Sequence, residues 1–375
     1  MLIRARHYGT REPIEILWED GWIRSAKPAT GAPVDVAAGW VAPALFDVQI
    51  NGCDRHSFNS ETLNEDSVRH VVDKCRSHGI AGLCPTLVTN SFSALQHGMS
   101  TLRQACEKDS VLARAIPGIH LEGPYISGED GPRGAHPRQF VRPPDWDEFR
   151  RLQDAAGGRI RMVTLAPELD GAFDFIERLA GTGMVVAIGH TAASPACIQA
   201  AIRAGARMST HLGNGSHAQL PRHENYLWEQ LAADDLWASI ICDGHHLPPS
   251  LVRCLVRVKT PARLILTCDA SSLAGLLPGR YREWDQDFDV LSGGKIMVAG
   301  TNFLAGSGVF TDACVGNVMR FAGVSLQDAV DMGSARPREL VGLPPVSLES
   351  GQQADLVLFD WQEGEDFRVV RTLVQ

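Results

Sequence analysis

The sequence predicts an α/β protein: a (β/α)8, TIM-like barrel joined to a small β-sandwich domain built from both chain termini. Short apolar runs rich in β-branched residues alternate with stretches of helical length, a pattern typical of βα units around a parallel sheet. In these stretches apolar residues recur at helical spacing, as Val68, Val71, Val72 and Cys75 do. Residues with acid/base or metal-ligand side chains follow several of the runs, and a barrel gathers such positions on one face.

Eight apolar runs are expected to form the barrel strands. Barrels of this kind take roughly 250 residues, which the chain can supply. An open doubly wound sheet is the main alternative, but it usually carries a glycine-rich phosphate turn after its first strand, and the first run here is not followed by one. In chain order, the expected strands are Leu45–Gly52, Gly82–Val88, Ile116–Gly123, Ile160–Pro167, Met184–His190, Met208–Asn214, Ala238–Gly244 and Leu264–Ala270.

The two chain ends differ from the middle in pattern. Residues 1–42 and 345–375 contain short strand-like runs broken by glycine and proline. We expect them to form one small β-sandwich domain, with residues 43–344 as the catalytic barrel. The stretch after Asp269 lacks long helical periodicity and predicts a hairpin-bearing insertion beside the active face.

Composition excludes several classes of partner. The formal charge is −9 and no run of Lys or Arg occurs, so we expect neither nucleic acid nor an anionic membrane surface as a partner.

The N-terminal segment does not resemble a signal peptide, and no apolar stretch reaches the ~18 residues of a spanning helix. Nine scattered cysteines without a Cys-x-x-Cys pair favour reduced, mostly buried thiols. A cytoplasmic protein is expected.

Three residues at run ends form a candidate metal site. Glu122, His190 and His211 follow the third, fifth and sixth runs. A catalytic zinc commonly keeps three protein ligands of this kind and leaves a fourth position for water. One divalent metal ion per subunit is therefore predicted, zinc above all, although iron, cobalt, nickel or manganese also suit a Glu-His-His set. Any single histidine at a strand end could instead be structural.

Asp269 is the candidate general acid and base. It closes the eighth run in an apolar context, where an unpaired carboxylate is costly to bury. Beside a metal site it could take a proton from water and pass it to a leaving amine; the alternative is a carboxylate that caps the following loop. His136 and His246 lie in loops expected at the same face and are candidate substrate ligands.

Motifs along nearly the whole chain resemble those of the amidohydrolase superfamily, and specifically of the N-acetylglucosamine-6-phosphate deacetylase family. The segment around Glu122, with the downstream Gly134-Ala-His136, is the most specific. The motifs follow in family order: Pro43-Ala-Leu-Phe-Asp47-Val-Gln49-Ile-Asn51-Gly52, His120-Leu-Glu122-Gly-Pro124, Thr210-His211-Leu-Gly-Asn214, Asp243-Gly-His245-His246, Asp269-Ala270, Leu304-Ala-Gly306-Ser307 and Gly351-x-x-Ala354-Asp355-Leu356.

The resemblance implies a barrel with a small β-sandwich and hydrolysis of the acetamide of an N-acetylhexosamine 6-phosphate, giving acetate and the amino sugar phosphate. It also implies roles for single residues. Glu122, His190 and His211 would hold the metal, and Asp269 would transfer protons. His136 would lie near the acetamide carbonyl, and His246 would bind substrate. Asn214 and Arg222 match the phosphate-binding positions, with Arg222 reaching over from a neighbouring subunit, so a homodimer is expected.

Two departures from the pattern limit what the resemblance implies. Gln49 and Asn51 stand where many amidohydrolases have His-x-His for a second metal, which favours a single-metal site. The loop from Gly213 to Asn225 differs from the usual phosphate-binding segment. An amidohydrolase acting on an N-acetylgalactosamine derivative or another unphosphorylated N-acyl compound therefore stays open, as does a non-catalytic sugar-binding protein. A cyclic-amide hydrolase is disfavoured, because it would need the first-strand histidine pair.

Overall fold

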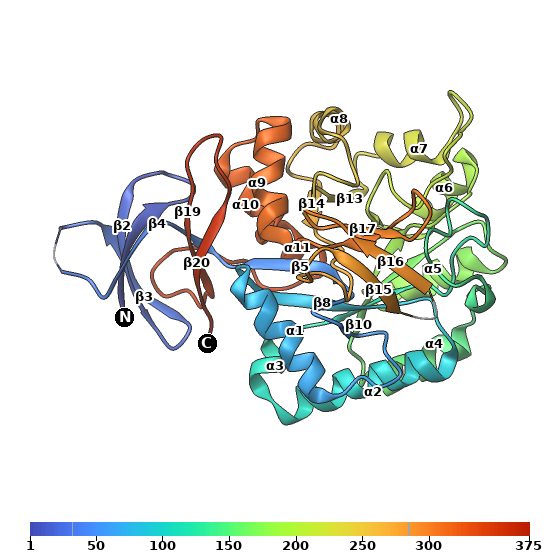
Figure 1. Cartoon of the computed structure of the whole chain (residues 1–375), viewed down its shortest axis with the longest axis horizontal. Helices are drawn as coiled ribbons and strands as arrows, with labels where there is room; N and C mark the ends of the chain where they lie inside the picture. Colours follow the sequence, from blue (N-terminus) through green and yellow to red (C-terminus); the bar gives the residue numbers. More distant parts are fainter. Residues whose placement is uncertain (32, 284–285) are drawn as a thin grey trace.

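Eight parallel strands form a barrel, as the sequence predicts (Figure 1). The computed structural model describes residues 1–31, 33–283 and 286–375. Each predicted run overlaps one strand, although β8 and β13 begin one or two residues before their runs. Most strands stop before the run does, because the polar residues at the run ends leave the sheet. In spatial order the strands are β5 (Leu45–Ile50), β8 (Ile80–Val88), β9 (Ile119–Glu122), β10 (Ile160–Leu165), β11 (Val185–Ile188), β12 (Met208–Ser209), β13 (Trp237–Ile241) and β14 (Leu264–Thr267).

Helices surround the barrel, and α1 shows why they form. The Asn64 side chain accepts a hydrogen bond from the Ser67 N–H, which caps the helix start, and the apolar residues at helical spacing are all buried against the sheet. The helices are α1 (Glu65–Ser77), α2 (Phe92–Lys108), α3 (Ser110–Ala115), the 3₁₀ helix η1 (Arg138–Phe140), α4 (Trp146–Ala155), α5 (Ala172–Gly181), α6 (Pro195–Ala204), α7 (Tyr226–Ala232), α8 (Pro249–Lys259), α9 (Thr311–Ala322), α10 (Leu326–Met332) and α11 (Ala335–Leu340).

Both chain ends contribute to one sheet at the side of the barrel (Figure 1). Alternating residues such as Ile3, Ala5 and Ile16 are buried on one face of this sheet, the pattern of a half-buried strand. The division of the chain at residues 42 and 345 remains a prediction. The six strands, in spatial order, are β20 (Arg368–Leu373), β19 (Leu356–Asp360), β4 (Val36–Pro43), β1 (Leu2–His7), β2 (Pro13–Glu19) and β3 (Trp22–Pro28).

Two smaller antiparallel sheets follow barrel strands. A hairpin made of two short strands, β6 (Gly52–Cys53) and β7 (His56–Ser57), follows β5. The expected insertion after Asp269 is a four-stranded sheet, with its own core around Phe288 and Ile296; its strands are β15 (Gly279–Glu283), β16 (Gln286–Val290), β17 (Lys295–Val298) and β18 (Leu304–Ser307). Within the described residues, no helix combines the length and apolar character needed to cross a bilayer.

The Asp47 carboxylate joins the first barrel strand to the last. It is fully buried and accepts hydrogen bonds from the Thr267 and Thr311 hydroxyls and from the backbone N–H groups of Gln49 and Cys268. Burial raises the pKa of Asp47, while these donors favour its charged form. Because β5 and β14 otherwise meet mainly through side-chain contacts and one bridge from Ile50, Asp47 contributes strongly to barrel closure.

Replacing Asp47 with alanine is expected to lower the free energy of unfolding by about 3 to 5 kcal/mol, because four buried donors lose their acceptor. Urea denaturation followed by circular dichroism measures the change. Asp366→Ala is the control, since the Asp366 side chain is 82% exposed and surface substitutions usually stay within about 0.5 kcal/mol. A loss below about 1 kcal/mol in Asp47→Ala would show that Asp47 does not hold the barrel closed.

Candidate active site

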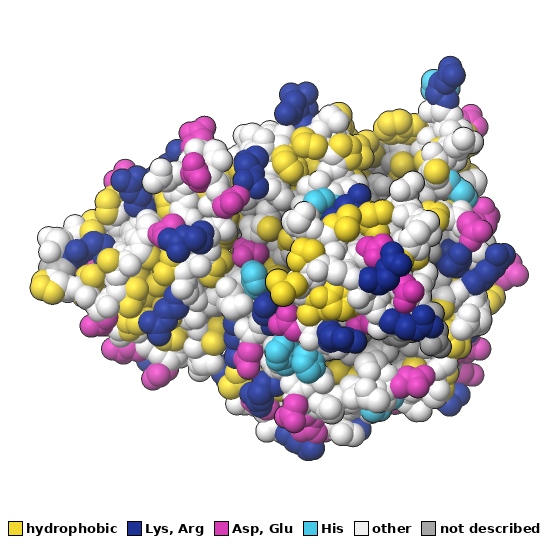
Figure 2. All heavy atoms as spheres, in the orientation of Figure 1, with side chains coloured by type: hydrophobic (Ala, Val, Ile, Leu, Met, Phe, Trp, Pro, Cys, Tyr) yellow, Lys and Arg dark blue, Asp and Glu magenta, His cyan; other side chains and the backbone are white. Residues whose placement is uncertain are grey.

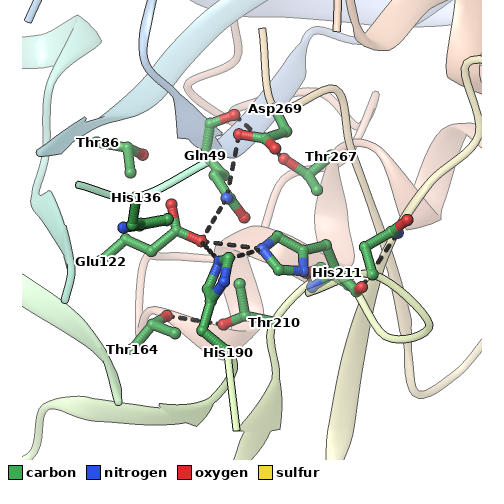
Figure 3. A network of polar contacts seen from close by, with 12 residues as sticks. Gln49, Thr86, Glu122, His136, Thr164, His190, Thr210, His211, Thr267 and Asp269 are labelled. Atoms are coloured by element: carbon green, nitrogen blue, oxygen red, sulfur yellow. Dashed lines mark hydrogen bonds and ion pairs between the residues drawn. The ribbon is translucent and has the colours of Figure 1, made fainter. Parts of the chain in front are cut away.

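Glu122, His190 and His211 meet at the carboxyl end of the barrel (Figure 3). Glu122 ends β9, while His190 and His211 lie directly beyond β11 and β12. The Glu122 Oε1 atom is 3.2 Å from His190 Nε2 and 3.0 Å from His211 Nε2, and the two Nε2 atoms are 3.1 Å apart. All three side chains are buried. The structure therefore brings the three predicted ligands to one point.

This geometry fits a single divalent metal. Tetrahedral zinc ligands at about 2.0 to 2.1 Å from the ion are separated by about 3.3 Å, close to the observed distances. The Pro132 carbonyl oxygen lies 2.8 Å from His190 Nδ1; a carbonyl only accepts, so Nδ1 carries the proton and Nε2 presents its lone pair to the site. Burial opposes ionisation of Glu122, but the neighbouring His190 and His211 hold its pKa well below the usual range.

The backbone turns three site residues inward. His190, His211 and Asp269 have φ angles of 52°, 31° and 52°, in the left-handed region that non-glycine residues rarely adopt. Such conformations cost about 1 to 3 kcal/mol each and cluster at functional sites. Three such positions therefore lie together at the end of the barrel where these side chains converge, although the other described non-glycine residues with this conformation lie outside the cluster.

Asp269 lies beside this cluster and is held by two amides. Its Oδ1 atom accepts hydrogen bonds from Asn51 Nδ2 at 2.7 Å and Gln49 Nε2 at 3.1 Å. Gln49 Nε2 also donates to Glu122 Oε1 at 3.0 Å, so one amide links the two carboxylates. Burial and the nearby Glu122 carboxylate raise the pKa of Asp269 to about 7. A carboxyl group of this kind suits proton transfer near neutral pH.

A chain of hydrogen bonds beneath the cluster fixes neighbouring strands. His120 Nε2 lies 2.7 Å from Thr164 Oγ1, which lies 2.7 Å from Thr210 Oγ1. Burial lowers the pKa of His120 to about 4, so this ring is neutral. Because His120 and Thr210 are close in sequence to Glu122 and His211, the chain ties the backbone segments that carry these ligands to β10.

A cavity of about 360 Å³ opens above the cluster. It is lined by three residues predicted to bind substrate, His136, Asn214 and His246. The His136 ring stands 4.3 Å from that of His190, and its Nδ1 hydrogen-bonds Thr89 Oγ1 at 2.8 Å. Burial and the neighbouring His190 lower the pKa of His136 to about 3, so the ring is neutral.

The orientation of His246 is fixed by Asp243. His246 Nδ1 lies 2.7 Å from Asp243 Oδ2, and the same carboxyl group accepts the His246 backbone N–H. The second ring nitrogen of His246 is thereby left for a ligand in the cavity.

Arg222 is the one predicted site residue that does not line this cavity. It is exposed on the loop before α7, beside a separate apolar groove that includes Trp228. Within one chain it therefore does not meet the other site residues. A role for Arg222 depends on a second copy of the chain and remains a prediction.

Several cavity residues were not predicted from the sequence. His217 lies within the altered loop, and Glu283 and Phe303 come from the β15–β18 insertion, which forms one side of the cavity. Glu283 accepts a hydrogen bond from the Ser272 hydroxyl. The sequence predicts an insertion beside the active face because the stretch after Asp269 lacks long helical periodicity. That pattern does not indicate which side chains of the insertion point into the cavity.

Comparison with known proteins identifies the family. The model of the amidohydrolase family matches residues 40–375. The chain belongs to this family. Among curated members, an N-acetylglucosamine-6-phosphate deacetylase from Danio rerio is 32% identical over 92% of this chain and 90% of its own length. An N-acetylgalactosamine-6-phosphate deacetylase from Escherichia coli O157:H7 is 30% identical over 96% of this chain and 95% of its own.

Solved structures of amidohydrolases agree with this assignment. N-acetyl-D-glucosamine-6-phosphate deacetylase from Mycobacterium smegmatis is 32% identical and superposes with a TM-score of 0.89, covering 100% of this chain and 98% of that one. A variant of the same enzyme, in complex with N-acetyl-D-glucosamine-6-phosphate, has the same TM-score and identity. This amidohydrolase thus shares both its barrel and its terminal sheet with a protein named N-acetyl-D-glucosamine-6-phosphate deacetylase.

Proposed function

We propose that this protein is a metal-dependent deacetylase that hydrolyses the acetamide of an N-acetylhexosamine 6-phosphate, foremost N-acetylglucosamine 6-phosphate. The products are acetate and the amino sugar phosphate. The observation that carries the proposal is the Glu122–His190–His211 cluster beside Asp269 in a sugar-sized cavity. The names of the family members above support the choice of substrate. Nine unpaired cysteines are in keeping with a cytoplasmic enzyme.

Glu122, His190 and His211 would hold one divalent metal ion, with zinc as the proposed metal. One carboxylate and two imidazoles match the ligands of catalytic zinc sites, while Gln49 and Asn51 are poor ligands for a second ion and are already engaged with Asp269. Bound there, the ion would supply Lewis-acid chemistry, polarising a carbonyl oxygen and favouring ionisation of water.

The protein side chains then share the proton transfers. The free oxygen of Asp269 takes a proton from the water that attacks the acetamide carbon, and returns it to the nitrogen as the C–N bond breaks. His136 is neutral; if Thr89 donates to its Nδ1, the Nε2–H faces the cavity and donates to the carbonyl oxygen. The water supplies one oxygen of acetate. One of its hydrogens reaches the amine nitrogen through Asp269, and the other is released when the acetic acid ionises to acetate.

A phosphate bound in this cavity favours a cation that the described lining of a single chain does not supply. Among the described residues that line the cavity, none is Lys or Arg. Backbone N–H groups of the glycine-rich segment Gly213–Gly215 can contact a phosphate, but a dianion favours a fixed guanidinium as well. We therefore propose a homodimer in which Arg222 of each subunit completes the site of the other.

Mixing two inactive variants tests the shared site. Arg222→Ala and Asp269→Asn each damage every site of their own dimers, but a heterodimer contains one intact site. Random exchange between equal amounts is expected to restore about a quarter of wild-type acetate release. As a control, Arg222→Ala mixed with the Arg222→Ala/Asp269→Asn double variant should recover nothing. Failure to recover activity although heterodimers form would place Arg222 outside the neighbouring site.

The substrate itself is tested by acetate release from four sugars: N-acetylglucosamine and N-acetylgalactosamine, each with and without a 6-phosphate. The protein's metal content is measured beforehand. We expect the highest kcat/KM with N-acetylglucosamine 6-phosphate. Preference for the galacto sugar phosphate would shift the assignment toward the Escherichia coli relative. Preference for unphosphorylated sugars, or no release by metal-loaded protein, would contradict the proposed substrate.

A further inference from the structure

A second group of metal-ligating side chains lies outside the active site, between the β6–β7 hairpin and helix α1. Cys53, Asp54 and His70 each offer one ligand atom, and these atoms all lie within 4.8 Å of one another. Figure 2 shows histidine side chains gathered on the surface beside α1. The proposed catalytic mechanism uses none of these residues.

The hairpin holds two of the donors rigidly. Asp54 and Arg55 form its two-residue turn with φ angles of 48° and 69°, as the tightest hairpin turns require. Their backbone N–H groups donate to the carbonyl oxygens of Ala274 and Ser272, at 2.9 and 2.7 Å. The hairpin is thereby fixed against the segment that follows the catalytic Asp269.

Helix α1 supplies the third donor and a competing cation. His70 Nε2 lies 3.2 Å from Asp54 Oδ2, and Lys74, one helical turn further on, places its Nζ 3.3 Å from the same oxygen. The His56 ring packs 4.2 Å from that of His70, which restrains it. Lys74 therefore offsets the charge of the same Asp54 carboxylate that a metal ion would bind.

The donor set is chemically selective. A thiol, an imidazole and a carboxylate together suit zinc and similar transition ions better than calcium or magnesium, which prefer oxygen alone. Zinc ligand atoms stand about 3.3 to 3.8 Å apart, so these groups would need to move together by about 1 Å. The Cys53 thiol is buried and close to Asp54, which raises its pKa to about 12; only a strongly bound cation would displace its proton.

We propose that Cys53, Asp54 and His70 form a second binding site for a thiophilic divalent cation such as Zn²⁺, separate from the active site. Binding releases the thiol proton to solvent, forms the sulfur–metal bond and displaces Lys74 from Asp54. A water molecule occupies the fourth position. The site links α1 to the hairpin, and the hairpin is hydrogen-bonded to Ser272 and Ala274, so occupancy would stabilise the fold at the edge of the active site.

Titration with Co²⁺ tests this site, because the active-site cluster contains no sulfur and cannot give a thiolate-to-cobalt charge-transfer band. The background is Cys254→Ser, since Cys254 is an exposed thiol on α8 that could bind metal on its own. We expect one equivalent of Co²⁺ with the charge-transfer band, in addition to the active-site equivalent. Absence of that band at saturating Co²⁺ would overturn the proposal.

Variants of single ligands complete the test. Cys53→Ser should lose the charge-transfer band, and His70→Gln should weaken Co²⁺ binding at this site at least about tenfold. Lys74→Met removes the competing ammonium and should tighten binding severalfold. His70 and Lys74 are partly exposed, so these two variants should fold even if Cys53→Ser does not. Equal affinity in wild type and His70→Gln would contradict the proposed ligand set.

Discussion

Replacing His211 with asparagine is expected to lower kcat/KM for the sugar phosphate by roughly 10³-fold or more. A metal ion held there would stabilise the developing charge by several kcal/mol, and each 1.36 kcal/mol is a factor of ten. The proposed ligand atom of His211, Nε2, lies 3.0 Å from Glu122 Oε1 and 3.1 Å from His190 Nε2, so its loss would leave two proposed ligands. Asparagine is chosen because it tolerates the left-handed backbone at this position.

Metal analysis separates loss of the ion from loss of the fold. The purified His211→Asn variant should hold much less than one active-site equivalent per chain, while circular dichroism stays like that of the wild type. His97→Asn is the matched control, because His97 hydrogen-bonds the Leu63 carbonyl oxygen and does not line the cavity. Full metal content together with full activity in His211→Asn would remove His211 from the ligand set.

The barrel and the position of the cluster could be predicted because both depend on local pattern. Apolar runs mark the strands, and the carboxyl ends of parallel strands share a face. Glu122, His190 and His211 were therefore expected to meet, although they are far apart in sequence. The left-handed backbone of His190 and His211 gave no signal in the sequence, since neither residue type requires it.

The contacts of Gln49 and Asn51 could not be predicted in the same way. Their residue types indicated only that a second metal is disfavoured. That their amides hold Asp269 depends on closure of the barrel, which brings the first strand beside the last. Glu283 and Phe303 lie in the β15–β18 insertion, whose sequence lacks a long helical periodicity, and the proposed role of Arg222 depends on a second chain. Each of these requires three-dimensional or quaternary information that periodicity does not contain.

Replacing Asp269 with asparagine is expected to lower kcat by roughly 10² to 10⁴-fold, the usual contribution of a general acid and base. Asparagine keeps the size of the side chain and tolerates the φ angle of 52°, but it cannot accept the proton from water or return it to the leaving nitrogen. Because Asp269 is not among the three converging ligands, metal content should stay at the wild-type value. Steady-state acetate release and metal analysis on the same preparation measure both.

Two further variants decide whether Asp269 acts by proton transfer or only by shaping the site. Asn51→Ala removes the 2.7 Å hydrogen bond to Asp269 Oδ1 and leaves the carboxyl group, so kcat should fall far less than in Asp269→Asn. Asp234→Asn, on the exposed surface, should leave kcat unchanged. If Asn51→Ala and Asp269→Asn lose the same activity, the position of the carboxyl group matters as much as its proton. If Asp269→Asn keeps wild-type turnover with its metal in place, proton transfer must be assigned to another group that lines the cavity, with His246 and His136 as the first to replace.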